Sequence, residues 1–133
     1  MPKTITQKII FRNAKVSDLY SMYLDSREHT KLTGNNTAKI SPKEGAAFSI
    51  YDGYSWGKNL QLVKDKLIVQ SWRASDWKKT DIDSTLIFSF EQHNNDTVIT
   101  MIHANVPDNQ AAALKNGWNE FYWKPWKKYL AEK

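Results

Sequence analysis

His103 is the side chain of this sequence best suited to acid–base chemistry. It lies in the stretch 97–105, in phase with Ile99 and Met101, and this alternation puts all three on the inner face of a strand. An apolar environment disfavours the charged imidazole, so the neutral ring can act as a base. No serine, cysteine or aspartate in the sequence is an obvious triad partner for it. We therefore expect His103 to be a hydrogen-bonded structural histidine rather than a catalytic one.

The other two histidines give no sign of a shared site. His29 lies next to a helix end and His93 lies in a turn, and we expect both on the surface. Three histidines spaced this widely, without a matching carboxylate cluster and without any cysteine, predict no metal site. There is also no glycine-rich loop that would cradle a phosphate. The sequence predicts no catalytic residue, no metal and no cofactor.

Charge and hydropathy argue against two further classes of protein. The chain has 19 Lys and Arg against 14 Asp and Glu, a net charge of +5, but the positive residues are scattered along it. A nucleic-acid site gathers such residues on one face, so we expect no nucleic-acid partner. No stretch approaches the roughly 18 to 20 apolar residues that cross a bilayer. The N-terminus lacks the apolar core of a signal peptide, which makes the cytoplasm the expected location.

The elements that must position these side chains can be predicted from hydrophobic periodicity. The length of 133 residues is that of one domain, 1–133. A strand at 4–11 is followed by two short helices, at 16–24 and 27–32. The period then changes to two, which predicts strands at 37–40, 46–52, 58–63, 67–74, 85–91 and 97–105.

A long helix is predicted from Asp108 to about Leu130, with an irregularity at Pro125 because proline removes one backbone hydrogen bond. Strands in succession followed by one helix predict an α+β fold. We expect a curved antiparallel sheet of about seven strands around the long C-terminal helix, with two short helices after the first strand. The helix should lay one row of side chains across the sheet: Leu114, Trp118, Phe121, Tyr122 and, near its end, Trp126.

The inner faces of the helix and the sheet predict a candidate ligand site. Its expected lining is Phe48, Ile50, Leu60, Gln70, Trp72, Phe88, Met101, His103, Trp118 and Tyr122. An apolar surface with a few polar groups, here Gln70, His103 and the Tyr122 hydroxyl, is typical of a small-ligand pocket. The same side chains can also pack solid, with each polar group bonded to a neighbour, and the sequence leaves both interpretations open.

Two tryptophans fall on or near loops. Trp77 lies in the polar stretch 75–83, and Trp56 lies just after the Asp52-Gly53 turn. Tryptophan is enriched at the centres of protein interfaces, so either residue is a candidate anchor for a partner protein. Either can equally fold back and cover the edge of the sheet.

Three segments of the sequence resemble one known family. The segment 48–77 (FSIYDGYSWGKNLQLVKDKLIVQSWRASDW), the strand VITMIHANVP and the helix start LKNGWNEFYW are similar to the C-terminal domain of the activators of the heat-shock-protein-ninety ATPase. The pairs His29-Thr30 and Thr33-Gly34 add to the resemblance. That domain belongs to the START-like (SRPBCC) superfamily, so the resemblance implies a helix-grip fold.

The resemblance also implies a function. It implies a non-enzymatic domain of the ATPase-activator type that docks on a chaperone or other protein, with a role in the stress response. The eukaryotic activators carry an additional N-terminal domain, and we expect this chain to correspond to the C-terminal domain. The apolar composition of the inner faces predicts binding of a small apolar ligand between helix and sheet. The alternative is a cyclase- or hydrolase-like enzyme that uses His103 in the cavity.

Overall fold

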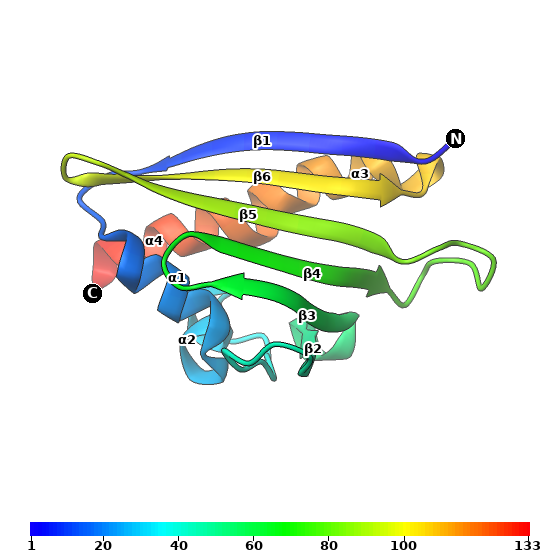
Figure 1. The fold of residues 1–133 in the computed structure, drawn as a ribbon, viewed down its shortest axis with the longest axis horizontal. Helices are drawn as coiled ribbons and strands as arrows, with labels where there is room; N and C mark the ends of the chain where they lie inside the picture. Colours follow the sequence, from blue (N-terminus) through cyan, green and yellow to red (C-terminus); the bar gives the residue numbers. More distant parts are fainter.

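Six antiparallel strands form one sheet, in the order β1-β6-β5-β4-β3-β2. The computed structural model describes all 133 residues. Figure 1 shows α3 and α4 running along one face of the sheet, with α1 and α2 at the end where α4 finishes. In chain order the elements are β1 (Lys3–Phe11), α1 (Val16–Leu24), α2 (Ser26–Leu32), β2 (Ala47–Ile50), a 3₁₀ turn (Tyr51–Gly53), β3 (Ser55–Val63), β4 (Leu67–Ala74), β5 (Ser84–His93), β6 (Asp96–Val106), α3 (Asp108–Trp118), a π-helical turn (Asn119–Trp123) and α4 (Lys124–Glu132). None of the helices combines the length and the hydrophobicity needed to cross a membrane.

Alternation along the central strands decides which face of the sheet packs against the helices. On β5 the side chains of Leu86, Phe88 and Phe90 are buried. Across the ladder to β6, Leu86 lies opposite His103 and Phe88 lies opposite Met101. Side chains point to alternate faces along a strand, so these residues share the covered face, as the sequence predicts.

The sheet has six strands and not the expected seven. The stretch 37–40 is not a strand, and only one bridge, between Lys39 and Ser49, joins it to β2. The backbone groups of Ile40 are instead satisfied by a helix side chain. The hydroxyl of Ser26 in α2 donates to the carbonyl oxygen of Ile40 at 2.8 Å and accepts from the N–H of Ile40 at 2.9 Å. A side chain that takes over the backbone partners of a segment competes with its pairing in a sheet.

The C-terminal helix is nearly continuous, and its irregular turn lies directly before Pro125, as predicted. A proline has no N–H, so the carbonyl oxygen of Phe121, four residues earlier, loses its helical partner. The hydroxyl of Tyr51 donates to that oxygen at 2.8 Å. A side chain from the segment between β2 and β3 thus compensates for the hydrogen bond that Pro125 removes.

The π-helical turn changes which side chains face the sheet. Residues five apart lie on one side of such a turn, and the rings of Trp118 and Trp123 stack with centroids 5.6 Å apart. Trp126 stacks in turn on Trp123 at 6.2 Å. Phe121, expected to lie across the sheet, is 56% exposed. That expectation assumed a regular α-helical period and is wrong, because the wider turn rotates Phe121 outward and Trp123 inward.

A substitution at Gly57 tests the close approach of β3 to β4. A Cβ atom at Gly57 would lie 1.8 Å from the carbonyl oxygen of Ser71. A backbone oxygen cannot yield without disturbing the ladder, so we expect Gly57→Ala to lower the free energy of unfolding by about 3 kcal/mol or more, measured by urea denaturation. The control is Gly117→Ala in α3, whose Cβ meets its nearest neighbour, in Phe121, at 3.5 Å. This change should stabilise the protein by up to about 1 kcal/mol. Wild-type stability for Gly57→Ala would contradict the described pairing.

Candidate functional site

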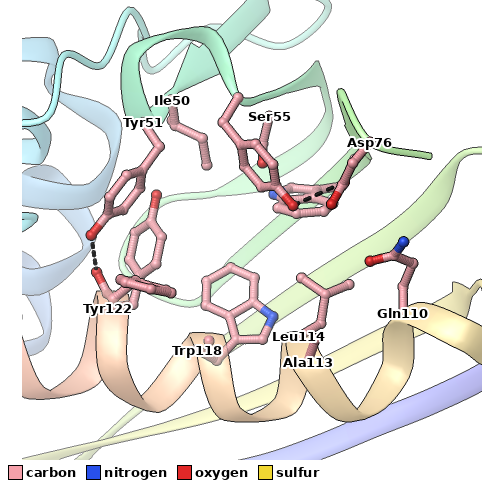
Figure 2. A pocket seen from close by; sticks show the side chains of 13 residues that line it. Ile50, Tyr51, Ser55, Asp76, Gln110, Ala113, Leu114, Trp118 and Tyr122 are labelled. Atoms are coloured by element: carbon pink, nitrogen blue, oxygen red, sulfur yellow. Dashed lines mark hydrogen bonds between the residues drawn. The ribbon is translucent and has the colours of Figure 1, made fainter.

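A cavity of about 380 Å³ lies between the C-terminal helix and the segment from Ile50 to Ser55. Nine of its thirteen lining residues are hydrophobic, which makes its surface predominantly apolar. Figure 2 shows Trp118 and Leu114 rising from the helix toward Ile50 and Ser55. The cavity reaches solvent, since Tyr54 and Phe121 in its wall are 41% and 56% exposed.

Four of the ten predicted lining residues are in this cavity: Ile50, Trp72, Trp118 and Tyr122. Five others are fully or almost fully buried in the core: Phe48, Gln70, Phe88, Met101 and His103. The interior beneath the helix is therefore filled at the centre of the sheet. The open space is displaced toward β2 and the turn that follows it.

Leu60 does not face the helix, and the prediction that it does is wrong. Its side chain is 53% exposed. The register of the β3–β4 ladder shifts between Asn59 and Gln61, so Leu60 lies at a bulge. A bulge interrupts the alternation of a strand. Here Asn59 is buried and Leu60 faces solvent.

His103 is held in a closed hydrogen-bond network. The indole Nε1 of Trp118 donates to His103 Nδ1 at 3.2 Å, so in the neutral ring the proton lies on Nε2. That nitrogen donates to the hydroxyl of Ser84 at 2.8 Å, and Ser84 donates to the carbonyl oxygen of Trp72 at 2.7 Å. Burial lowers the pKa of His103 to about 3. The ring has no free lone pair and the serine proton points away from it, so the pair is not arranged as a base and a nucleophile.

His29, expected on the surface, is completely buried, and that expectation is wrong. Its Nδ1 lies 2.6 Å from the carbonyl oxygen of Tyr23, which can only accept, so Nδ1 donates. Nε2 then accepts from the hydroxyl of Tyr122 at 2.8 Å. Burial lowers the pKa of His29 to about 4, against a smaller opposing effect of the bond to Tyr23. The spacing of three residues between His29 and Leu32, also buried, was the available signal.

Gln70, the third polar group predicted for the cavity, is also bonded to neighbours. Its Oε1 accepts from the hydroxyl of Tyr23 at 3.3 Å, and its Nε2 donates to Asn59 Oδ1 at 2.9 Å. Asn59 in turn donates to the carbonyl oxygen of Ser41 at 2.8 Å. The side chains of Gln70, His103 and Tyr122 are therefore all hydrogen-bonded to other residues of the core. None of the three presents a free polar group to the cavity.

The loop between β4 and β5 closes one end of the site. Trp77 is buried and its ring lies 5.7 Å from that of Trp72, so it folds back onto the sheet. Arg73 holds the loop by donating to the carbonyl oxygens of Lys78 and Asp81. Trp56 is 41% exposed on β3. Of the two loop tryptophans, only Trp56 presents a surface that a partner could contact.

At the mouth of the cavity, the hydroxyl of Tyr54 donates to Asp76 Oδ1 at 2.9 Å. Burial, followed by the bond and the charge of Asp76, raises the pKa of Tyr54 to about 12, so the hydroxyl keeps its proton. No three carboxylate or histidine side chains lie close enough together to hold a metal ion. The chemistry available at the site is that of an apolar, aromatic surface with one carboxylate at its edge.

Comparison with known proteins identifies relatives. Residues 13–131 match the family model described as "Activator of Hsp90 ATPase homolog 1-like protein". An uncharacterized protein of Schizosaccharomyces pombe is 29% identical over 113 residues, which cover 85% of this chain and 33% of that protein. The human "Activator of 90 kDa heat shock protein ATPase homolog 1" is 24% identical over 107 residues, which cover 80% of this chain and 31% of that protein. The chain thus spans about a third of the length of these curated relatives.

The fold is shared with solved structures of nearly the same size. The crystal structure of an HSP90 activator from Plasmodium falciparum superposes with a TM-score of 0.84 at 24% identity, covering 98% of this chain and 96% of that one. An α+β sheet around a long C-terminal helix is therefore the architecture common to the two chains.

The two buried histidines predict a loss of stability in mild acid. Their pKa values are about 4 for His29 and about 3 for His103 in the folded protein, against 6.5 for an ordinary histidine. The unfolded chain therefore binds more protons below pH 6.5. The stabilisation is complete above that pH and is lost as the pH falls toward the folded values. Between about pH 5.5 and pH 4.5, each histidine should lower the free energy of unfolding by up to about 1.4 kcal/mol per pH unit.

Chemical denaturation of His29→Gln, His103→Gln and His93→Gln at several pH values checks this. In His29→Gln and in His103→Gln, the part of the pH dependence of the free energy of unfolding that the two histidines cause should fall by about half. His93 is exposed beside Glu91, so His93→Gln controls for the substitution itself and should have about the wild-type stability at pH 7. Wild-type slopes in both buried-site variants would contradict the assignment.

Proposed function

The chain belongs to the Activator of Hsp90 ATPase homolog 1-like family, as its sequence predicts, and we propose that it is a non-enzymatic START-like binding domain that holds a small apolar ligand between its C-terminal helix and its sheet. The observation that carries this proposal is the open apolar cavity of about 380 Å³. Pockets of about 300 to 1,000 Å³ with mostly hydrophobic and aromatic walls are typical of small-ligand sites.

The wall of the cavity supports binding rather than catalysis. Leu114, Trp118 and Ile50 supply apolar surface, and burial of such surface is the main favourable contribution to binding. His103, the residue considered as a catalytic base, has both ring nitrogens hydrogen-bonded, one to Trp118 and one to Ser84. A ligand would exchange solvent for aromatic contacts and would meet neither a histidine base nor a serine nucleophile activated by one.

Filling the cavity from α3 tests the proposal. Ala113 lines the cavity, whereas its neighbour Ala112 lines a separate surface depression beside β1. Titration of the protein with 1-octanol, followed by intrinsic tryptophan fluorescence, should show saturable binding. We expect Ala113→Phe to weaken that binding by about tenfold or more, because the new ring occupies the ligand's space. The matched control Ala112→Phe should bind like the wild type. If both variants bind 1-octanol equally tightly, the ligand lies elsewhere and the proposal is wrong.

A second candidate function is docking on an Hsp90-type chaperone, in the cytoplasm, where we expect this protein. It is supported by the names of the relatives, which are described as activators of the 90 kDa heat shock protein ATPase. It is also supported by two exposed apolar side chains on β3, since Trp56 is 41% and Leu60 is 53% exposed. Exposed tryptophan is a frequent anchor of protein interfaces.

The docking function is tested by measuring the ATPase rate of a purified Hsp90-type chaperone with and without this protein. We expect a higher rate with the protein present. The double variant Trp56→Ser/Leu60→Ser should need about tenfold more protein for the same stimulation, because loss of a buried aromatic anchor costs this much affinity. Ala112→Phe is a control away from β3. An unchanged ATPase rate at saturating protein would remove this candidate.

A further inference from the structure

The walls of the cavity combine many aromatic rings with one charge. Among its thirteen lining residues Asp76 is the only charged one, and no lysine, arginine or histidine is present. Nearly half of the lining is aromatic: Tyr51, Tyr54, Trp72, Trp118, Phe121 and Tyr122. The face of an aromatic ring carries negative charge and attracts cations. An anionic ligand would find neither a positive partner nor a neutral environment here.

We propose that the ligand of this cavity is an amphiphilic organic cation, an apolar chain or ring system that carries a protonated amine. The inference rests on the proposed ligand-binding function and specifies the chemical class of the ligand. The ammonium group would lie at the mouth beside Asp76, and the apolar part would lie along Trp118 and Leu114.

The position of Asp76 supports this orientation. Its side chain is exposed and forms no salt bridge with any Lys, Arg or His, although Lys78 and Lys79 follow closely in the chain. Its only hydrogen-bond partner is the Tyr54 hydroxyl, which leaves most of its lone pairs free. Figure 2 shows Asp76 and Gln110 at the same end of the cavity. The amide oxygen of Gln110 is a second acceptor available to an ammonium group.

At the other end of the cavity the two tyrosine hydroxyls are already bonded. The hydroxyl of Tyr122 donates to His29, and the hydroxyl of Tyr51 donates to the Phe121 carbonyl oxygen. The indole Nε1 of Trp72 has no hydrogen-bond partner, but it is completely buried and presents no donor at the cavity surface. Ser55 and Gln110 add only uncharged polar groups to the lining. The cavity is therefore mostly suited to hydrocarbon, and its only charge, on Asp76, is negative.

Three probes of equal chain length test the proposal. n-Octylamine is a cation at pH 7, 1-octanol is neutral and octanoate is an anion. Each is titrated below its micelle concentration while tryptophan fluorescence is recorded. We expect octylamine to bind about tenfold more tightly than octanol, and octanoate about tenfold more weakly than octanol, from the combined attraction of the rings and of Asp76.

The role of the carboxylate is tested with Asp76→Asn, which keeps an acceptor for Tyr54. This variant should bind octylamine about fivefold more weakly and should bind octanol like the wild type. Asp18→Asn, the same charge change at an exposed position of α1 outside the cavity, should leave both affinities unchanged. Octanol binding equal to or tighter than octylamine binding would overturn the cationic ligand while leaving the binding function intact. If none of the three probes binds, the proposed binding function fails with it.

Discussion

The stacking of Trp118, Trp123 and Trp126 along the C-terminal helix is the interaction on which the rest of the structure depends. A regular α-helix would not bring residues 118 and 123 to the same side, and the π-helical turn between them does so. The turn also rotates Phe121 outward to the edge of the cavity. It further aims Tyr122 inward at His29. Because the side chains of this turn fill the space over the centre of the sheet, the open cavity lies beside β2.

The two buried histidines are held by hydrogen bonds on both ring nitrogens, which favours one packing of the elements around them. Each buried histidine donates one hydrogen bond and accepts another, His29 between Tyr23 and Tyr122 and His103 between Ser84 and Trp118. A buried polar group without a partner is costly, so such networks fix the register of the elements that contribute to them. A catalytic site needs polar groups that keep a free donor or acceptor until a substrate arrives. Both buried histidines are fully bonded, whereas Asp76 at the mouth of the cavity keeps free lone pairs.

Local sequence patterns were sufficient to predict the sheet faces of β5 and β6, the two short helices and the irregularity at Pro125. They failed where geometry departs from a regular period. The bulge that exposes Leu60 and the π-turn that exposes Phe121 both shift the phase of an element by one residue. The pairing of Ser84 with His103 depends on strand register across 19 residues, which periodicity does not contain. The hydroxyl of Ser26 in α2 replaces a strand partner for Ile40, and this contact between distant residues is likewise absent from local patterns.

Five of the six tryptophans lie in one unbroken row. Neighbouring ring centroids are 5.7 Å apart for Trp77 and Trp72, 6.2 Å for Trp72 and Trp118, 5.6 Å for Trp118 and Trp123 and 6.2 Å for Trp123 and Trp126. Indoles this close couple their electronic transitions and pass excitation energy from one to the next. The row is therefore a continuous path for energy transfer that runs from the β4–β5 loop past the cavity to α4. Fluorescence excited at either end of the row therefore depends on what contacts Trp118 in the middle.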